Sequence, residues 1–305
     1  MRTIPIERCP DREALALRRA LADQMNIAAD RIVAGNGVAE LIWLVALAFI
    51  RPGDRVLVLG PTFGEYTRAA ALMGAQVEIL SAQPEQDFVV NPDDVTRSLR
   101  RVQPRLVFLC NPNNPSGTLT SLETIDAWAR SHPQTIFIVG EAYLTFATTA
   151  CSSLTIGVNN ILVMRSMTKD YALAGLRLGY AVSHEDVIDA MERVRPPWSV
   201  NSMAQAAGAA VLADKEHLRS SLGKLARANE QMVSGLRALG LTPLPPAVRF
   251  FIVPVEDGAA FRRHLLRRKI MVRDCASFGL PAHGRITTRR LEENARLLDA
   301  IQEMV

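Results

Sequence analysis

Short apolar runs alternate with amphipathic stretches along the first part of the chain. Between residues 30 and 182, each run rich in Val, Ile or Leu precedes a loop with Gly, Pro or Asn and then a stretch with helical periodicity. This rhythm is typical of an α/β domain with a mostly parallel sheet. The expected strands lie at 31–34, 55–59, 76–80, 105–110, 135–139, 161–165 and 177–182. Open α/β sheets bind ligands at the carboxyl ends of their strands, so functional side chains are expected there.

The pattern changes after residue 197, where long helical patterns replace the alternation. The expected elements are helices at 202–213 and 215–239 and strands at 249–255, 270–273 and 285–289. A helical pattern over 12–25 precedes the first strand, and we expect that helix to pack on the second unit. The sequence therefore predicts a large α/β domain over 27–200 and a smaller α+β domain formed by 1–26 and 201–305.

Composition adds a few limits to this picture. The chain has 305 residues, 49% of them hydrophobic and 22% charged, which is enough to bury a large core. The longest apolar run, 41–50, is far below the roughly 18 residues that cross a bilayer, and residues 1–10 lack the apolar core of a signal peptide. Four scattered cysteines indicate neither a disulfide framework nor a metal site. We therefore expect a cytoplasmic protein without a membrane partner.

The formal net charge of +4 comes with basic clusters such as Arg262-Arg263 and 267–269. These residues alternate with leucines at helical spacing, which is typical of a solvated helix face, and no aromatic stacking platform accompanies them. A nucleic-acid partner is therefore not expected. A modest positive balance suits an enzyme that handles anionic cofactors or phosphorylated substrates.

The strongest local signal is the run Arg165-Ser166-Met167-Thr168-Lys169, which follows an apolar strand. A lysine amine captures carbonyl groups only when its positive charge is suppressed, and a partly buried strand end near other cations has that effect. The two hydroxyls and nearby Arg177 are groups that bind a phosphate dianion. A lone lysine in such a loop would more often be solvated, but its neighbours favour a functional role.

Three further motifs follow predicted strands, and each is ambiguous by itself. Residues 111–117 read NPNNPSG, which is compatible with nothing more than a tight turn. Residues 35–40 read GNGVAE, a glycine turn that opens a helix and could hold a phosphate on its backbone N–H groups. This turn lacks the third glycine of a dinucleotide-binding fingerprint. Residues 61–66 read PTFGEY, where Phe63 is either a core residue or an aromatic ring at the sheet edge.

The order and placement of these motifs resemble one family. The chain is similar to the fold-type I pyridoxal phosphate (PLP) aminotransferases, in the branch with histidinol-phosphate aminotransferase and threonine-phosphate decarboxylase. The resemblance runs from about Cys9 to the C-terminus. Its most specific segments are NPNNPSG (111–117), EAY (141–143), RSMTKDYALAGLRLGY (165–180), PPWSVN (196–201), VRDCASFGLP (272–281) and RITTRRLEEN (285–294). The last three are closer to the decarboxylase.

The resemblance implies a role for each matching residue. Lys169 would hold the cofactor as a Schiff base and shuttle protons at the substrate Cα. Asn114 and Tyr143 would hydrogen-bond the phenolic oxygen of the cofactor, and Phe63 would stack on its pyridine ring. The cofactor phosphate would be held by Val38, Ala39, Ser166, Thr168 and Arg177. Arg285 would bind the carboxylate of an amino acid or 2-oxo acid substrate. A homodimer is also implied, because the active site of this fold is completed across the subunit interface.

The chain departs from the family pattern in several places. Relatives carry an Asp before Glu-Ala-Tyr that pairs with the pyridine nitrogen, and Gly140 stands at that position here. The loss of such a bond is worth roughly 1.5–3 kcal/mol, or about one to two decades of rate. Glu141 is adjacent but is expected to point to the other face of the strand. Cys9 replaces a tyrosine that reaches the partner's cofactor phosphate, few residues precede it where relatives have an N-terminal arm, and Arg249 replaces an Asn or His.

Three functions stay open at this point. The leading hypothesis is an aminotransferase that passes an amino group between an amino acid, which could be phosphorylated, and a 2-oxo acid. The second is a lyase that decarboxylates a phosphorylated amino acid with the same cofactor, like the threonine-phosphate decarboxylase of cobalamin biosynthesis. The third is a degenerate PLP-binding protein with little activity, motivated by Gly140 and Cys9.

Overall fold

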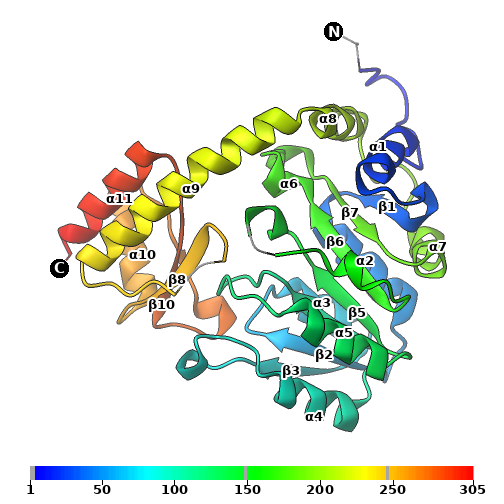
Figure 1. The fold of residues 1–305 in the computed structure, drawn as a ribbon, viewed down its shortest axis with the longest axis horizontal. Coiled ribbons are helices and arrows are strands. Elements are labelled where there is room, and N and C mark those ends of the chain that lie inside the picture. The colour runs from blue at the N-terminus through cyan, green and yellow to red at the C-terminus, as the bar shows by residue number, and fades with distance from the viewer. Residues whose placement is uncertain (1–3, 148–149, 245–246, 305) are drawn as a thin grey trace.

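The centre of the protein is a seven-stranded sheet with the strand order β1-β7-β6-β5-β4-β2-β3 (Figure 1). The structure is a computed structural model that describes residues 4–147, 150–244 and 247–304. The strands are β1 (Ile32–Gly35), β2 (Arg55–Gly60), β3 (Gln76–Ser81), β4 (Leu106–Cys110), β5 (Ile136–Gly140), β6 (Ile161–Ser166) and β7 (Gly179–Val182). β7 runs antiparallel to β1 and β6, and the other neighbours are parallel. This topology confirms the expected α/β fold with a mostly parallel sheet.

Helices cover both faces of this sheet. One face is covered by α2 (Gly37–Phe49), α3 (Glu65–Leu72) and α7 (Glu185–Val194). The other face is covered by α4 (Pro92–Val102) and α5 (Leu122–Ser131) at one end and by α1 (Leu15–Met25) and α8 (Ser202–Ala213) at the other. Short 3₁₀ turns lie at η1 (Ala29–Arg31), η2 (Pro84–Gln86), η3 (Leu144–Phe146), η4 (Ser153–Ile156), η5 (Ala174–Leu176) and η6 (Ala276–Phe278).

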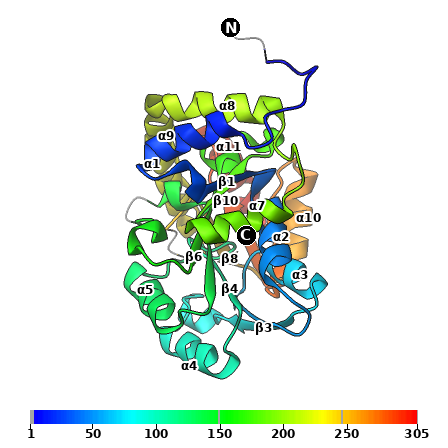
Figure 2. The ribbon, with the colours of Figure 1, turned by 90° about the vertical axis from the view of Figure 1, so that its right-hand side faces the viewer.

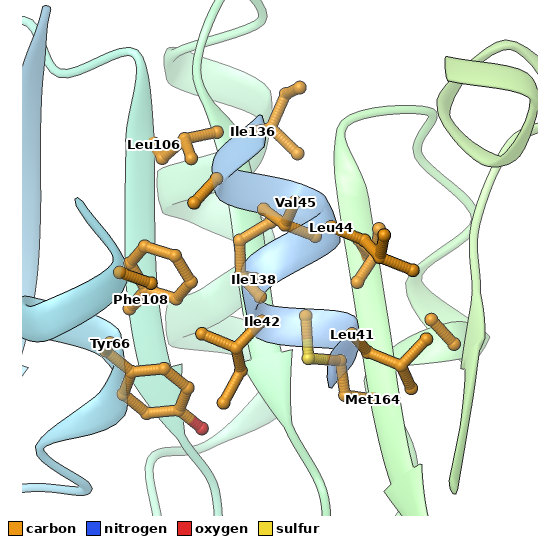
Figure 3. Packing of buried hydrophobic residues seen from close by; sticks show 14 of the residues in the cluster. Leu41, Ile42, Leu44, Val45, Tyr66, Leu106, Phe108, Ile136, Ile138 and Met164 are labelled. Carbon is orange, nitrogen blue, oxygen red and sulfur yellow. The ribbon is translucent and has the colours of Figure 1, made fainter. Parts of the chain in front are cut away.

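The central strands are continuous apolar runs because both of their faces are buried. In β5, Ile138 packs under α2 while Phe137 and Val139 pack toward α4 and α5. Figure 3 shows how side chains of α2, among them Ile42, lie against Phe108 and Ile138 on the sheet. This packing fixes the carboxyl ends of β4, β5 and β6, where the functional side chains were expected.

A second, three-stranded antiparallel sheet has the order β8-β10-β9. Its elements are β8 (Phe250–Pro254), β9 (Arg273–Asp274) and β10 (His283–Thr287), packed against α9 (Lys215–Ala238), α10 (Gly258–Arg267) and α11 (Leu291–Gln302). This unit confirms the expected smaller α+β part. The strand expected over 270–273 is wrong for its first three residues, because only Arg273 and Asp274 are in register with β10.

The 24-residue helix α9 connects the two sheets (Figure 1). Its last turns bury Met232 and Leu236 in the core of the small sheet. Helix α1 lies beside α8 (Figure 2), and Leu17 and Leu21 of α1 share a core with Ile32 of the large sheet. The first helix therefore packs on both α8 and β1, and the domain bounds given above stay a prediction. None of the helices in the described ranges has the length and apolarity needed to cross a membrane.

Candidate active site

Lys169 lies at the carboxyl edge of the large sheet, on the single turn α6 (Met167–Asp170) that follows β6 directly. Met167 and Thr168 are buried and anchor this turn, whereas the Lys169 side chain is exposed. Partial desolvation lowers the pKa of the Lys169 amine, and the positive charges of Arg177 and Arg285 lower it further. An amine that loses its proton more readily is available as a nucleophile.

A corner rich in hydrogen-bond donors lies at the start of α2, around Arg177, whose charge acts on Lys169. Gly37 has φ +79°, and the Arg177 guanidinium packs so closely over it that a Cβ there would lie 2.8 Å from Nη2. A Cβ at Gly179, the strand partner of Ser166, would lie 2.9 Å from the backbone nitrogen of Val38. The Ser166 and Thr168 hydroxyls hydrogen-bond each other at 2.6 Å. The residues predicted for the phosphate, Val38, Ala39, Ser166, Thr168 and Arg177, therefore flank one corner.

In the loop 111–117 after β4, some asparagine side chains stabilise the loop and another contacts the site. The Asn111 side chain pairs with both backbone groups of Thr120, and the Asn113 amide donates to Pro61 O and Ser116 Oγ at 2.9 Å. Asn114 is different, because its carboxamide oxygen accepts from Nη1 of Arg285. Most of this motif is a rigid turn, and it presents one amide to the site.

Arg285 and Tyr143 pack against the same aromatic ring, that of Phe250 in the small sheet. Arg285 comes from β10, and its Nε is buried without a partner among the described residues. Its guanidinium carbon lies 5.4 Å from the ring centroid of Phe250, and the Tyr143 ring meets the same ring edge-on at 4.7 Å. Burial raises the pKa of Tyr143 to about 12, against the opposing charge of Arg285. The phenol therefore stays protonated, and the buried Nε of Arg285 is a hydrogen-bond donor that no described residue satisfies.

Phe63 lies at the rim of the site, after β2. Its side chain is 36% exposed, and its ring meets Tyr66 edge-on at 6.0 Å. The other candidate interpretation, a fully buried core residue, is therefore wrong for Phe63. The core position in this motif is taken by Tyr66, which is 2% exposed and was not singled out from the sequence.

Glu141 points away from the site, as alternation along the strand predicts. Its carboxylate accepts hydrogen bonds from Arg165, from the Ser152 hydroxyl at 2.7 Å and from the Ser153 backbone N–H at 2.6 Å. Glu141 therefore links the end of β5 to β6 and to the residues that begin η4, on the side away from Lys169. It is not a substitute for the aspartate that Gly140 replaces.

Asp170, next to Lys169, is a partly buried acid that was not singled out from the sequence. Its Oδ2 accepts from the Thr145 hydroxyl at 2.9 Å, while Oδ1 has no partner among the described residues. Burial raises the pKa of Asp170 to about 6, although Thr145 and the charges of Arg165, Arg249 and Lys169 oppose this shift. The ionised form of the Asp170 carboxyl group is therefore disfavoured in the folded protein relative to the unfolded chain.

The raised pKa of Asp170 predicts that the free energy of unfolding depends on pH. Between about pH 4 and pH 6 the folded chain keeps the Asp170 proton and the unfolded chain loses it, so the free energy of unfolding falls as pH rises through this window. Asp170→Asn removes the slope. In urea unfolding without cofactor, the variant should gain about 2 kcal/mol relative to the parent between pH 4 and pH 8. Parallel curves for the two proteins would contradict this interpretation.

All residues of this site lie within a segment that matches a known protein family. Residues 4–301 match the model of the family Aminotransferase class I and II. The chain belongs to this family. Its members use PLP, so the protein is a PLP-dependent aminotransferase.

Relatives and solved structures agree with this assignment. Histidinol-phosphate aminotransferase 1 of Nitrosococcus oceani is 34% identical, covering 98% of this chain and 81% of its own. The enzyme of that name from Symbiobacterium thermophilum is 36% identical over 96% and 81%. Histidinol-phosphate aminotransferase from Clostridium acetobutylicum superimposes with a TM-score of 0.90 at 23% identity, over 98% of this chain and 91% of the other.

Two further solved structures are similar to this aminotransferase. L-threonine-O-3-phosphate decarboxylase from Porphyromonas gingivalis superimposes with a TM-score of 0.86 at 26% identity, over 98% of this chain and 91% of the other. Histidinol-phosphate aminotransferase from Sinorhizobium meliloti, in complex with pyridoxal-5'-phosphate, has a TM-score of 0.86 at 24% identity, over 98% and 83%.

The side chains at the site fit the cofactor of the family. The glycine turn under Arg177 places backbone N–H groups beside a guanidinium, and a phosphate dianion binds donors of both kinds. Lys169 offers an amine whose pKa is lowered, and Phe63 offers an exposed aromatic ring within the same region. The Nε of Arg285, which has no hydrogen-bond partner among the described residues, is a further donor that an anion could accept from. Gly140 is a poor match, because it brings no side chain.

Proposed function

We propose that this aminotransferase moves an amino group between a phosphate-bearing amino compound, of which histidinol phosphate is the model substrate, and a 2-oxo acid. The names of the relatives support this choice. The observation that carries it is a basic cavity of about 610 Å³ within the smaller α+β part, which shares Arg285 with the site around Lys169. Its charged lining consists of Arg262, Lys269, Arg273, Arg285, Arg289, Arg296 and Glu293. Such an excess of cations attracts and orients a phosphate group.

The roles of the cofactor-binding residues are part of this proposal. The N–H groups of Val38 and Ala39, the hydroxyls of Ser166 and Thr168, and the Arg177 guanidinium would hold the cofactor phosphate. Phe63 would stack on the ring, and Asn114 and Tyr143 would hydrogen-bond its phenolic oxygen. When bound, PLP supplies a carbonyl that captures amines and a ring that takes up electrons from the substrate Cα.

Lys169 and Arg285 would act on the substrate itself. The Lys169 amine, with its lowered pKa, would hold the cofactor and then move a proton at the substrate Cα through Nζ. Arg285 would bind the carboxylate of the 2-oxo acid through its free donors, because a guanidinium binds carboxylates bidentately. Its contact with Asn114 joins the substrate-binding strand β10 to the large sheet.

A second candidate is decarboxylation of a phosphorylated amino acid. The threonine-phosphate decarboxylase likeness favours it, at 26% identity over nearly the whole chain. Both reactions need the same cofactor cage and the same basic cavity, and they differ in which substrate bond breaks.

One experiment separates the two candidates. The holoenzyme is incubated with L-histidinol phosphate and 2-oxoglutarate, and separately with O-phospho-L-threonine. We expect glutamate in the first reaction and no carbon dioxide in the second. Carbon dioxide without glutamate would replace the first candidate by the second, and neither product would reject both substrates.

The basic cavity predicts a specific effect of Arg273→Gln. The KM for histidinol phosphate should rise about tenfold with little change in kcat, because a hydrogen bond to a charged group is worth roughly 1.5–3 kcal/mol. Arg263→Gln is the matched control, since Arg263 is exposed on α10 and does not line the cavity. The difference between the variants should shrink at high salt and disappear with unphosphorylated histidinol. Equal KM values for both variants would reject the cavity as the phosphate site.

We also propose that the enzyme works as a homodimer in the cytoplasm. The family resemblance supports the dimer, because it places Cys9 where relatives reach the cofactor of the neighbouring subunit. The cysteines Cys9, Cys110, Cys151 and Cys275 are all free, which suits a reducing compartment. Sedimentation equilibrium of the holoenzyme tests the dimer, and a mass of 33.5 kDa would reject it.

A further inference from the structure

The space in front of Gly140 is filled by another residue. Gly140 ends β5 between Cys110 of β4 and Met164 of β6. A Cβ added at Gly140 would come closer than 3.0 Å to the hydroxyl oxygen of Tyr66, a separation that real Cβ atoms essentially never show. The Tyr66 hydroxyl therefore occupies the position at which a side chain of residue 140 would begin.

Packing holds Tyr66 in this position. Its ring stacks on Phe108 with centroids 4.9 Å apart and an angle of 18° between the planes. Phe63 closes the outer side edge-on, and only 2% of Tyr66 is exposed. Figure 3 shows the ring beside Phe108, with its hydroxyl at the carboxyl end of the packed face. A ring clamped on both sides keeps its hydroxyl in one place.

Among the described residues, the groups that act on this hydroxyl are uncharged, and the Cys110 thiol is its hydrogen-bonding neighbour. Burial raises the pKa of Tyr66 well above its ordinary value, and Cys110 and Tyr143 raise it further. Burial also raises the pKa of the Cys110 thiol to about 11. Glu141, the nearest acid along the strand, is bound to Arg165 on the other face. The carboxyl end of β5 thus presents a neutral phenol where relatives present a carboxylate.

We propose that the Tyr66 hydroxyl donates a hydrogen bond to the ring nitrogen of PLP, and that this nitrogen is bound without a proton. The ring nitrogen lies opposite the carbon that bears the aldehyde, so in a cofactor attached to Lys169 it would lie on the far side of the ring. The family resemblance implies that it would face the position of residue 140. A carboxylate there would accept a hydrogen bond from a protonated nitrogen. A neutral phenol instead donates to the nitrogen lone pair. The inference rests on the cofactor of the family and not on the proposed substrate.

The ¹⁵N chemical shift of ring-labelled PLP tests this proposal, because it distinguishes a protonated from an unprotonated ring nitrogen. In the holoenzyme we expect the shift of an unprotonated, hydrogen-bonded nitrogen. In Tyr66→Phe, which keeps the ring and its packing, the shift should move further toward that of the free unprotonated ring. The shift of a protonated nitrogen in the parent enzyme would overturn the proposal, and so would identical shifts in the parent and Tyr66→Phe.

A paired substitution adds an independent outcome. Gly140→Asp alone collides with Tyr66, so the carboxylate should reach the ring nitrogen only when Tyr66→Phe removes the hydroxyl. We expect the double variant to show a protonated nitrogen and to bind PLP about tenfold more tightly than Tyr66→Phe, as one added charge-assisted hydrogen bond provides. An unprotonated nitrogen in the double variant would count against the proposal.

Two controls accompany these measurements. Tyr171→Phe removes a phenol that packs at the edge of the α1 and α8 core, and it should leave the ¹⁵N shift unchanged. A shift equal to that of Tyr66→Phe would overturn the assignment to Tyr66. Borohydride reduction and peptide mapping of each protein show whether the cofactor is attached to Lys169. A failure of cofactor binding is thereby separated from a failure of the inference.

Discussion

Replacing Lys169 by alanine should lower the rate of amino transfer by at least about 10³-fold while leaving the fold intact. The side chain is exposed at the end of α6, so its removal leaves no cavity in the core. What is lost is the amine with a lowered pKa between the cations Arg177 and Arg285. The rate is measured as glutamate formed in single turnovers, and the fold by circular dichroism and urea unfolding.

The chain has four lysines, so few residues other than Lys169 have to be tested as controls. The other three, Lys215, Lys224 and Lys269, lie in the C-terminal part of the chain. Lys224→Ala on the exposed face of α9 is the matched control and should keep the parental rate. After borohydride reduction, peptide mapping should find the modified residue at Lys169. A modified lysine at any of the other three positions would contradict the whole assignment of the site.

The fold was predictable because its determinants are local. Strands buried on both faces, such as β4 and β5, need continuous apolar runs, and those runs are visible in the sequence. The weakest prediction was the strand over 270–273. Its pairing is limited by the two residues of β10 that reach it, Gly284 and Arg285, and that limit is set by the tertiary structure.

Part of the site was predictable for a similar reason. Lys169, Asn114 and Tyr143 each follow a strand directly, and parallel strands bring their carboxyl ends to the same edge. The contact of Arg285 with Asn114 joins residues 171 positions apart. The family resemblance implied a site role for each residue but did not predict this contact. Local patterns identify which edge is functional, but they do not show which distant side chains meet there.

The remaining features depend on long-range packing and were not predictable. Gly140 marks a missing side chain, but a glycine carries no record of what fills its space. Tyr66, 74 positions earlier, reaches that space because α3 packs on β4 through the stacked pair with Phe108. In the same way, the sequence placed Glu141 on the far face, but its partner Arg165 is fixed by the pairing of β5 with β6.

Glu141→Gln should lower the free energy of unfolding by about 3 kcal/mol, because it removes the charge from a buried ion pair. The Glu141 side chain is 1% exposed, and Arg165 lies 3.0 Å from Oε2 with 20% of its side chain exposed. Glutamine keeps the size of the side chain but places an NH₂ group among donors, so some of those hydrogen bonds are lost as well. Urea unfolding of the parent and the variant measures the difference.

Two further proteins identify the source of this loss. Glu85→Gln changes an exposed glutamate at η2 and should alter the stability by less than about 0.5 kcal/mol. Arg165→Gln should destabilise as well, and the double variant with Glu141→Gln should lose less than the sum of the single losses, because the two side chains are in contact. Additive losses would show that Glu141 acts through Ser152 and Ser153 alone. In that case the end of β6, and with it Lys169, would be positioned by the strand pairing and not by the ion pair.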